Sequence, residues 1–367
     1  MISQIRAHLA LLVAGMVAFV LMGVGSAVYG PVLPGMAERY TLTLGEAGWL
    51  ISAHWIGNAV GIATMYFLAE KVPSGLALAI MAAGAAALAL APGWAPTLAA
   101  AFVFGAGYGM VTAVFNPAML TAFGARGTGM LSLLNAMYGI GAIAGPLIYV
   151  QLGQNAGTVF GGLAVICAAA SVGTALTLKP GGKSTQSAPR IGFRVDPVIL
   201  GFGALGVGLE ACLVGLGPAA LMAAGVTDVR AAELLSVFFA AFLGARILLI
   251  FTAHLIPSFW IYLFAAASAL IFGLGAVFLS PGLFFVAMGI SASLYFPAFY
   301  VTATRAMGSD PRVPSVIIGA GLVGGISMPL MLAPLTQTEG LAFFYTVAVL
   351  GLILTLGSLI SLPRYRV

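Results

Sequence analysis

The chain has 367 residues, of which 62% are hydrophobic and only 6% are charged. A soluble domain averages about 25% charged residues, so this composition excludes an ordinary water-facing surface. The net charge of +5 is spread over a largely apolar chain, and it gives no reason to expect a nucleic-acid partner. The two cysteines, Cys167 and Cys212, lie inside apolar runs and predict no disulfide framework.

Apolar runs of the length needed to cross a bilayer as a helix, about 20 residues, follow one another along the chain. The first begins near His8 and is too long for the core of a signal peptide, so we interpret it as a spanning helix. The twelve predicted spans are 8–33, 45–68, 74–92, 97–121, 128–151, 156–178, 197–222, 230–254, 257–279, 282–304, 313–335 and 339–362. The sequence therefore predicts an all-α integral membrane protein.

One long polar stretch, residues 179–196, divides the spans into six and six. It reads KPGGKSTQSAPRIGFRVD and holds four of the 14 lysines and arginines. We expect a cytoplasmic linker here, joining an N-terminal six-helix bundle, residues 1–178, to a C-terminal six-helix bundle, residues 197–367.

Lysine and arginine are distributed unevenly between the two ends of the predicted spans. With the N-terminus inside, eleven lie at the inner ends and two, Arg39 and Arg230, at the outer ends. Because cytoplasmic loops are enriched in these residues, we predict a multi-pass protein of the inner (plasma) membrane with both termini in the cytoplasm.

The two halves also resemble each other in sequence. Residues 141–148 read GAIAGPLI in span five, and residues 324–331 read GGISMPLM in span eleven, 183 positions later. Pro117 in span four and Pro297 in span ten, 180 positions apart, are each followed by alanine and preceded by an aromatic residue one or two positions earlier. Such parallel repeats predict two pseudo-symmetric bundles with a solute site near the midplane between them.

Six plus six helices, inside termini and a basic central linker resemble the major facilitator superfamily over the whole chain. The superfamily's loop after span two typically reads Gly-x-Leu-Ala-Asp-Arg-x-Gly-Arg, whereas residues 66–74 read YFLAEKVPS. Glu70 and Lys71 keep the charge order of that loop, but its glycines and final basic residue are missing. The resemblance implies the major facilitator fold and a gating role for Glu70 and Lys71.

Within this superfamily the chain is most similar to the fucose permease-like transporters. Residues 133–141 (LLNAMYGIG) with Gly145-Pro146 resemble their span five, 208–210 (GLE) their span seven, and 244–246 (GAR) their span eight. Fucose permease also has acidic residues in spans one and four that this chain lacks, so its sugar specificity and proton site are not carried over. The Gly145-Pro146 region also resembles drug antiporters, which leaves the direction of transport open.

Glu210 is the residue that most strongly suggests chemistry. It lies 13 residues beyond Pro197, about 20 Å along a helix, near the membrane middle. A charge there costs roughly 2.5–3.5 kcal/mol on insertion scales, and intramembrane acids are mostly functional. We predict that Glu210 couples protons or binds solute; the alternative is a structural residue hydrogen-bonded to neighbouring helices.

Two further residues carry charge or a titratable ring inside predicted spans. His54 is a second proton-coupling candidate, because a histidine can titrate near neutral pH, and it shares a helix face with Asn58. A neutral, hydrogen-bonded histidine is the alternative. Arg246 is a candidate for binding an anionic or hydroxylated solute or for neutralising Glu210; otherwise it snorkels to the inner surface or locks a gate.

Amides and phenols in the spans extend the set of candidate substrate-binding residues. Packing between helices is the alternative for each, at about 0.6 kcal/mol per hydrogen bond. Besides Arg246 and Asn58, the set comprises Asn116, Asn135, Tyr138, Tyr295 and Tyr300. Thr43 and Glu46 are typical of a capping box that opens span two, so we assign Glu46 a structural role.

Together these observations predict a secondary active transporter rather than an enzyme, with no cofactor and no metal. The chain has no phosphate-binding Gly-x-x-x-x-Gly-Lys-[Ser/Thr] sequence, which argues against ATP-driven transport by this chain. We expect a monomer in the lipid bilayer that carries a small polar organic solute by alternating access, with protons as the coupling ion in symport. The alternatives are a proton-driven exporter of amphipathic compounds, a facilitative uniporter, or a transport-inactive sensor or assembly factor on the same scaffold.

Overall fold

The structure is a computed structural model. It describes residues 6–68, 74–123, 127–177, 194–252, 255–308, 310, 313–336 and 341–365. All regular secondary structure within these ranges is helical.

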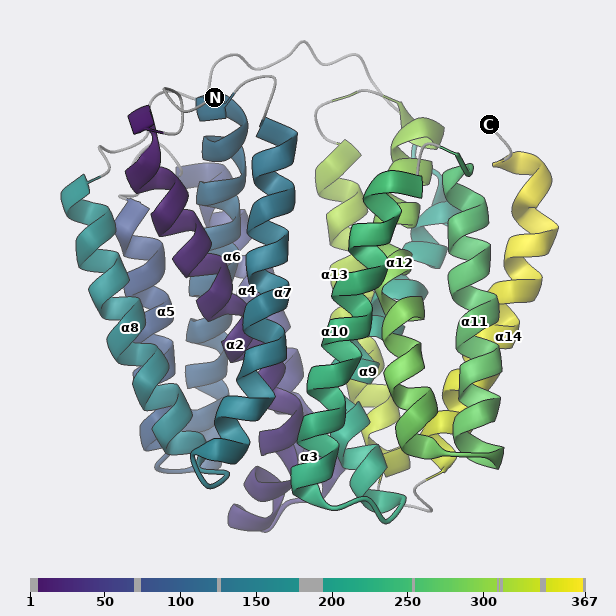
Figure 1. Ribbon diagram of the computed structural model, residues 1–367, viewed down its shortest axis with the longest axis horizontal. Helices are drawn as coiled ribbons and strands as arrows, with labels where there is room; N and C mark the ends of the chain where they lie inside the picture. The colour runs from purple at the N-terminus through teal and green to yellow at the C-terminus, as the bar shows by residue number, and fades with distance from the viewer. Residues whose placement is uncertain are drawn as a thin grey trace. The chain divides into compact units, whose positions relative to one another are not determined.

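Twelve helices of 17 residues or more account for most of the described chain (Figure 1). They are α2 (Leu9–Arg39), α4 (Trp49–Leu68), α5 (Ser74–Leu90), α6 (Trp94–Phe123), α7 (Gly127–Gln151), α8 (Ala156–Thr177), α9 (Pro197–Ala223), α10 (Asp228–Thr252), α11 (Ser258–Phe278), α12 (Pro281–Met307), α13 (Val313–Leu332) and α14 (Ala342–Ser361). Each corresponds to one predicted span. Within the described ranges, ten helical stretches are long and apolar enough to cross a membrane, and α5 is a shorter apolar helix, which confirms the all-α membrane fold class.

The largest differences from the predicted boundaries occur around the connection between the first two spans. Helix α2 continues to Arg39, past the predicted end at residue 33. The predicted capping box is confirmed: the Glu46 amide donates to Thr43 Oγ1 at 3.2 Å, and the Thr43 amide donates to Glu46 Oε2 at 2.8 Å. It opens a separate one-turn helix, α3 (Leu44–Ala47), and Gly48 lies between this turn and the start of α4.

The chain forms two compact units. Unit 1 comprises residues 1–32 and 53–186, and unit 2 comprises residues 33–52 and 187–367. Helices α2 and α4 therefore each contribute to both units. The predicted division at residues 179–196 stays a prediction, because most of that stretch lies outside the described residues.

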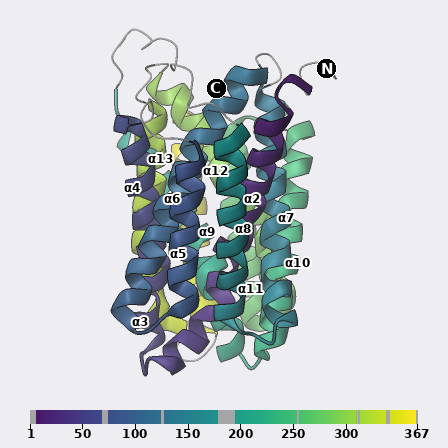
Figure 2. The same ribbon diagram turned by 90° about the vertical axis from the view of Figure 1, so that its left-hand side faces the viewer.

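Glycines allow the helices of unit 1 to pack with their backbones in contact. A methyl group on Gly57 of α4 would overlap the Phe102 carbonyl of α6, and one on Gly141 of α7 would overlap the Val20 carbonyl of α2. Small residues have this role wherever membrane helices approach closely. Helix α5 packs against both α6 and α8, and Figure 2 shows it running beside α8.

Aromatic side chains hold the helices of unit 2 together. Phe202 on α9 lies edge-on to Tyr262 on α11, with ring centroids 5.5 Å apart, and the Tyr262 hydroxyl donates to the Phe202 carbonyl at 2.6 Å. Tyr295 on α12 lies against Tyr262 at 5.3 Å. Since a buried phenol needs a hydrogen-bond partner, these contacts fix the relative positions of α9, α11 and α12.

Candidate functional site

Glu210 lies on α9, a helix that contacts α10 within unit 2. Its Oε2 atom is buried and makes no hydrogen bond to any described residue. An unpartnered carboxylate oxygen inside a protein is costly, because water no longer solvates its charge. A buried, unpartnered carboxylate oxygen is expected of an intramembrane acid that exchanges a proton or pairs with a cation in another state of the protein.

Arg246 on α10 is the predicted partner of Glu210, and its side chain is half-buried. Its Nε donates to the Ser293 carbonyl of α12 at 3.3 Å, and its guanidinium carbon lies 4.5 Å from the Phe242 ring centroid. Among the described side chains, the structure has no ion pair between Arg246 and Glu210 within 4.0 Å. The guanidinium is thus held by a backbone carbonyl and an aromatic face.

A second group of buried polar side chains lies in unit 1. We call Tyr29, His54 and Asn58 the His54 cluster. All three are at least 95% buried, and the rings of Tyr29 and His54 lie 5.1 Å apart. Both His54 nitrogens, the Tyr29 hydroxyl and Asn58 Oδ1 have no hydrogen-bond partner among the residues that the structure describes.

Aromatic rings enclose the His54 cluster. Phe104 and Tyr108 of α6 lie 5.7 and 5.2 Å from the His54 ring, and Trp55 lies 5.7 Å from it. Buried polar atoms are normally satisfied by protein or by ordered water. A cluster with four unsatisfied atoms is therefore a candidate place for a solute, water or a proton.

The other predicted amides of unit 1 are distributed over α6 and α7. Asn116 is half-buried and its Oδ1 is buried without a described partner. Asn135 is exposed, whereas Tyr138 is half-buried and its hydroxyl shares a 2.9 Å hydrogen bond with Ser26 Oγ on α2. Asn135 makes further contacts of its own.

The two predicted tyrosines of α12 have different surroundings. Tyr295 is fully buried, and its hydroxyl donates to the Ala265 carbonyl of α11 at 3.3 Å. These contacts fit the packing alternative. Tyr300 is half-buried with its ring 5.8 Å from Phe296. Glu70 and Lys71, the predicted gating pair, lie outside the described residues.

The sequence analysis did not single out Tyr29 or Asp196. Tyr29 is an ordinary tyrosine in an apolar helix, and only the fold shows that its ring meets His54. Asp196 caps α9, with Oδ1 accepting from the Val198 and Ile199 amides at 3.1 and 3.4 Å. Its sequence signal was available, because Asp followed by Pro is a typical helix start.

Long apolar helices that bury ionisable and amide side chains define the class of protein: a multi-pass membrane protein. The Major Facilitator Superfamily family model matches residues 15–329, so the chain belongs to that superfamily. No curated protein matches the chain.

Solved structures of transporters share the fold over nearly the whole chain. A variant of the nucleoside transporter NupG has a TM-score of 0.76 at 15% identity, with 96% of this chain and 98% of that chain covered. The D-xylose-proton symporter has a TM-score of 0.72 at 13% identity and 96% coverage of both chains. The transporter FucP has a TM-score of 0.63 at 17% identity, covering 95% of this chain and 98% of its own. The fold is that of the superfamily, and the fucose permease-like branch is not singled out.

Proposed function

We infer that this membrane transporter is a secondary active one. It moves a small polar organic solute across the inner membrane by alternating access, coupled to protons. The observation that carries this proposal is the buried, unpartnered Oε2 atom of Glu210 in a chain of the Major Facilitator Superfamily.

The proton-coupling role of Glu210 follows from its surroundings. A buried carboxylate is stable when it takes up a proton or when a cation approaches it. Arg246 is the nearby cation, and a carbonyl rather than a carboxylate now accepts its Nε hydrogen. We propose two states: one with Arg246 on the Ser293 carbonyl and a proton on Glu210, and one with the two side chains paired and the proton released.

The solute class follows from the free hydrogen-bonding atoms of unit 1. Asn58 Oδ1 and Asn116 Oδ1 are acceptors without described partners, so they suit hydroxyl or N–H donors. His54 and Tyr29 add ring nitrogens and a phenol that can donate or accept. We therefore propose a hydroxyl-bearing ring compound. Two transporters with a similar fold, the nucleoside transporter NupG and the D-xylose-proton symporter, carry compounds of this class.

Other predicted binding residues enter the proposal with different weight. The remaining proposed solute contacts are Asn135, which is exposed, and Tyr138 and Tyr300, which are half-buried. Tyr295 is left out, because its hydroxyl and ring are already used by neighbouring helices.

A thermal-shift screen of the purified protein tests the solute class. Nucleosides, sugars, carboxylates and amphipathic cations are compared at equal concentration. We expect a nucleoside or sugar to raise the unfolding midpoint, and the same compound to support counterflow exchange in proteoliposomes. Asn116→Ala should weaken that shift, whereas Asn155→Ala, an exposed cap of α8, should leave it unchanged. Stabilisation by amphipathic cations alone would favour the exporter alternative, and stabilisation without exchange would favour a sensor.

A further inference from the structure

Residues 33–52, which connect the first two spans, belong to unit 2, although the rest of both spans belongs to unit 1. We call them the 33–52 segment: the end of α2, helix α3 and the first residues of α4. Helix α2 carries Pro31 and Pro34 at the boundary and can bend there, whereas α4 crosses the boundary after Ser52 without a proline. The first turn of α4 is therefore tied to unit 1 through a continuous helix.

A buried hydrogen bond joins the segment to α13. The Ser52 hydroxyl donates to the Ile326 carbonyl at 2.9 Å, and Ser52 is fully buried. The charged side chains of the segment form no ion pair with any residue that the structure describes; they are Glu38, Arg39 and Glu46. The attachment can therefore be broken without separating opposite charges.

Glycines on both sides of the contact allow the segment to lie close to the rest of unit 2. A methyl group added to Gly48 would lie 2.9 Å from the Cβ of Ala333 in the short helix η3 (Ala333–Thr336), which packs against α3. A methyl group added to Gly215 of α9 would lie 2.5 Å from Cδ1 of Ile51, and its three nearest atoms all belong to Ile51. Carbon atoms in contact are about 3.5–4.0 Å apart, so either methyl group would push the segment outward.

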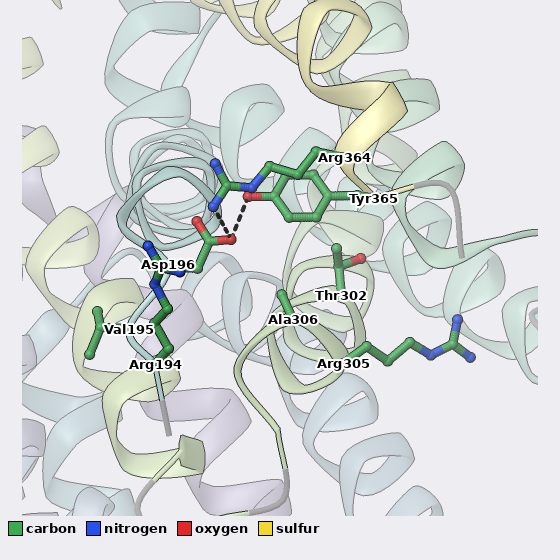
Figure 3. Close-up of a pocket in the computed structure, with 8 residues that line it drawn as sticks. All are labelled: Arg194, Val195, Asp196, Thr302, Arg305, Ala306, Arg364 and Tyr365. Atoms are coloured by element: carbon green, nitrogen blue, oxygen red, sulfur yellow. Dashed lines mark hydrogen bonds and ion pairs between the residues drawn. The ribbon is translucent and has the colours of Figure 1, made fainter. Parts of the chain in front are cut away.

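The start of α9 is attached to unit 2 in a different way. Asp196 Oδ2 accepts from Arg364 Nη2 at 2.8 Å and from the Tyr365 hydroxyl at 3.0 Å, as the dashed lines in Figure 3 show. Hydrogen bonds that involve a charged group are roughly twice as strong as neutral ones. The neutral contact of Ser52 is by comparison suited to a surface that closes and opens.

We propose that the 33–52 segment is a detachable latch, which closes on α9, α13 and η3 and is released when α4 moves with unit 1. Release breaks the hydrogen bond between Ser52 and Ile326 and uncovers the faces of α9 and α13 beneath the segment. The strength of the latch sets how often the protein opens here. The consequence for transport rests on the proposed alternating access, whereas the docking of the segment does not.

The test measures how often the latch opens, with Ser52→Cys as a reporter in the full-length protein in detergent. The thiol is close in size to the buried hydroxyl, and it reacts with a maleimide only when the segment leaves α13. Cys167 and Cys212 are buried, so the unmodified chain gives the background rate. When the latch recloses faster than the thiol reacts, the labelling rate is proportional to the population of the open state.

Two matched pairs of glycine variants are compared in the reporter chain. Gly48→Ala and Gly215→Ala place a methyl group between the latch and the rest of unit 2. Gly35→Ala in the segment and Gly201→Ala on α9 are the controls, because a methyl group at either position meets nothing within 4 Å. We expect Gly48→Ala to raise the labelling rate roughly tenfold and Gly215→Ala roughly threefold, since the end of the Ile51 side chain can rotate away. The controls should label at the rate of the reporter chain.

A second reporter separates latch opening from general unfolding. Ser291→Cys lies in a fully buried position on α12, away from the segment, and its labelling should not respond to the variants. An equal rise at both reporters, or equal rates in the Gly48→Ala and Gly35→Ala chains, would overturn the latch. If Gly48→Ala does not fold, Gly215→Ala against Gly201→Ala decides the question in the same way.

The labelling needs neither solute nor gradient, so it also separates this inference from the proposed function. If no compound supports counterflow exchange, the transport proposal fails, and the labelling ratios still decide whether the latch opens.

Discussion

Arg246 on α10 donates a hydrogen bond from Nε to the carbonyl oxygen of Ser293 on α12, at 3.3 Å. The same guanidinium lies over the Phe242 ring, 4.5 Å from its centroid. A charge that is permanent at all relevant pH values is therefore held by a dipole and an aromatic face, close to the helix that carries Glu210. Among the residues that the structure describes, Arg246 makes no further hydrogen bond, so its terminal nitrogens can donate to a solute or to the acid.

The first prediction follows from the shape of that guanidinium. Arg246→Lys keeps the positive charge but replaces a fork of donors by a single point charge. We expect it to weaken binding of the stabilising solute by about tenfold, the loss of roughly one charged hydrogen bond. Isothermal titration calorimetry measures this directly. Arg230→Lys, an exposed ion-pair member on the same helix, is the control and should bind as the wild type does. Unchanged affinity in Arg246→Lys would instead support a snorkelling arginine.

The second prediction concerns the orientation of the chain in the membrane. Cys167 and Cys212 are both free and fully buried, so they contribute little background to cysteine labelling. We expect Val229→Cys, exposed at the start of α10, to react with an impermeant maleimide in intact cells. Thr185→Cys in the predicted cytoplasmic linker should react only after the membrane is permeabilised. Labelling of residue 185 from outside would exclude the twelve-span orientation.

Every long helix was predicted from the sequence, because a helix needs a run of about 20 apolar residues to cross the bilayer. It also predicted the capping box at Thr43, since cap residues act over three positions of the chain. The separate helix α3 was not anticipated, because a capping box indicates where a helix begins and carries no signal of where it ends.

Candidate side chains were found by type, but their partners were not. Glu210 and His54 stand out in any apolar helix, whereas the contact of Arg246 with the Ser293 carbonyl joins residues 47 positions apart. Tyr295 shows what the sequence does not reveal. Its phenol could face either a cavity or a neighbouring helix, and the helical period alone does not distinguish these two surroundings. The fold resolves this by placing the hydroxyl on the Ala265 carbonyl.

The third prediction tests the close packing of α9 and α13. A methyl group on Gly324 would overlap the Ala204 carbonyl of α9, whereas one on Gly319 of the same helix would meet nothing within 4 Å. Gly324→Ala should therefore lower the free energy of unfolding by about 1–3 kcal/mol through overpacking. Gly319→Ala should raise it by about 0.5–1 kcal/mol, because alanine loses less entropy in a helix. Equal midpoints for the two variants would contradict the packing described here.

The fourth prediction is a pH dependence at Tyr365, which follows the last helix. Burial and the hydrogen bond to Asp196 raise the pKa of the Tyr365 hydroxyl from 10.0 to about 12. Because the folded-state pKa is the higher one, the stability from this hydroxyl is present below pH 10 and is lost as the pH rises through 12. Tyr365→Phe should unfold at a lower temperature by a constant margin up to pH 10, and that margin should shrink between pH 10 and 12. A margin that stays the same from pH 10 to 12 would contradict the raised pKa of this hydroxyl in the folded protein.

Proton coupling by Glu210 is central to the proposed transport mechanism. Glu210→Gln preserves the shape of the side chain and most of its hydrogen bonding, but the amide cannot take up or release a proton. The decisive measurement uses proteoliposomes that contain a trapped pH dye, with the solute found in the stabilisation screen. Glu233→Gln, a partly exposed acid on α10, is the matched control. We predict that Glu210→Gln binds the solute and exchanges it in counterflow. This variant should not accumulate the solute when a proton gradient is imposed, and it should not acidify the lumen when solute is added. Glu233→Gln should accumulate the solute and acidify the lumen as the wild type does. Gradient-driven accumulation with lumen acidification in Glu210→Gln would contradict the coupling role and leave Glu210 as a structural residue.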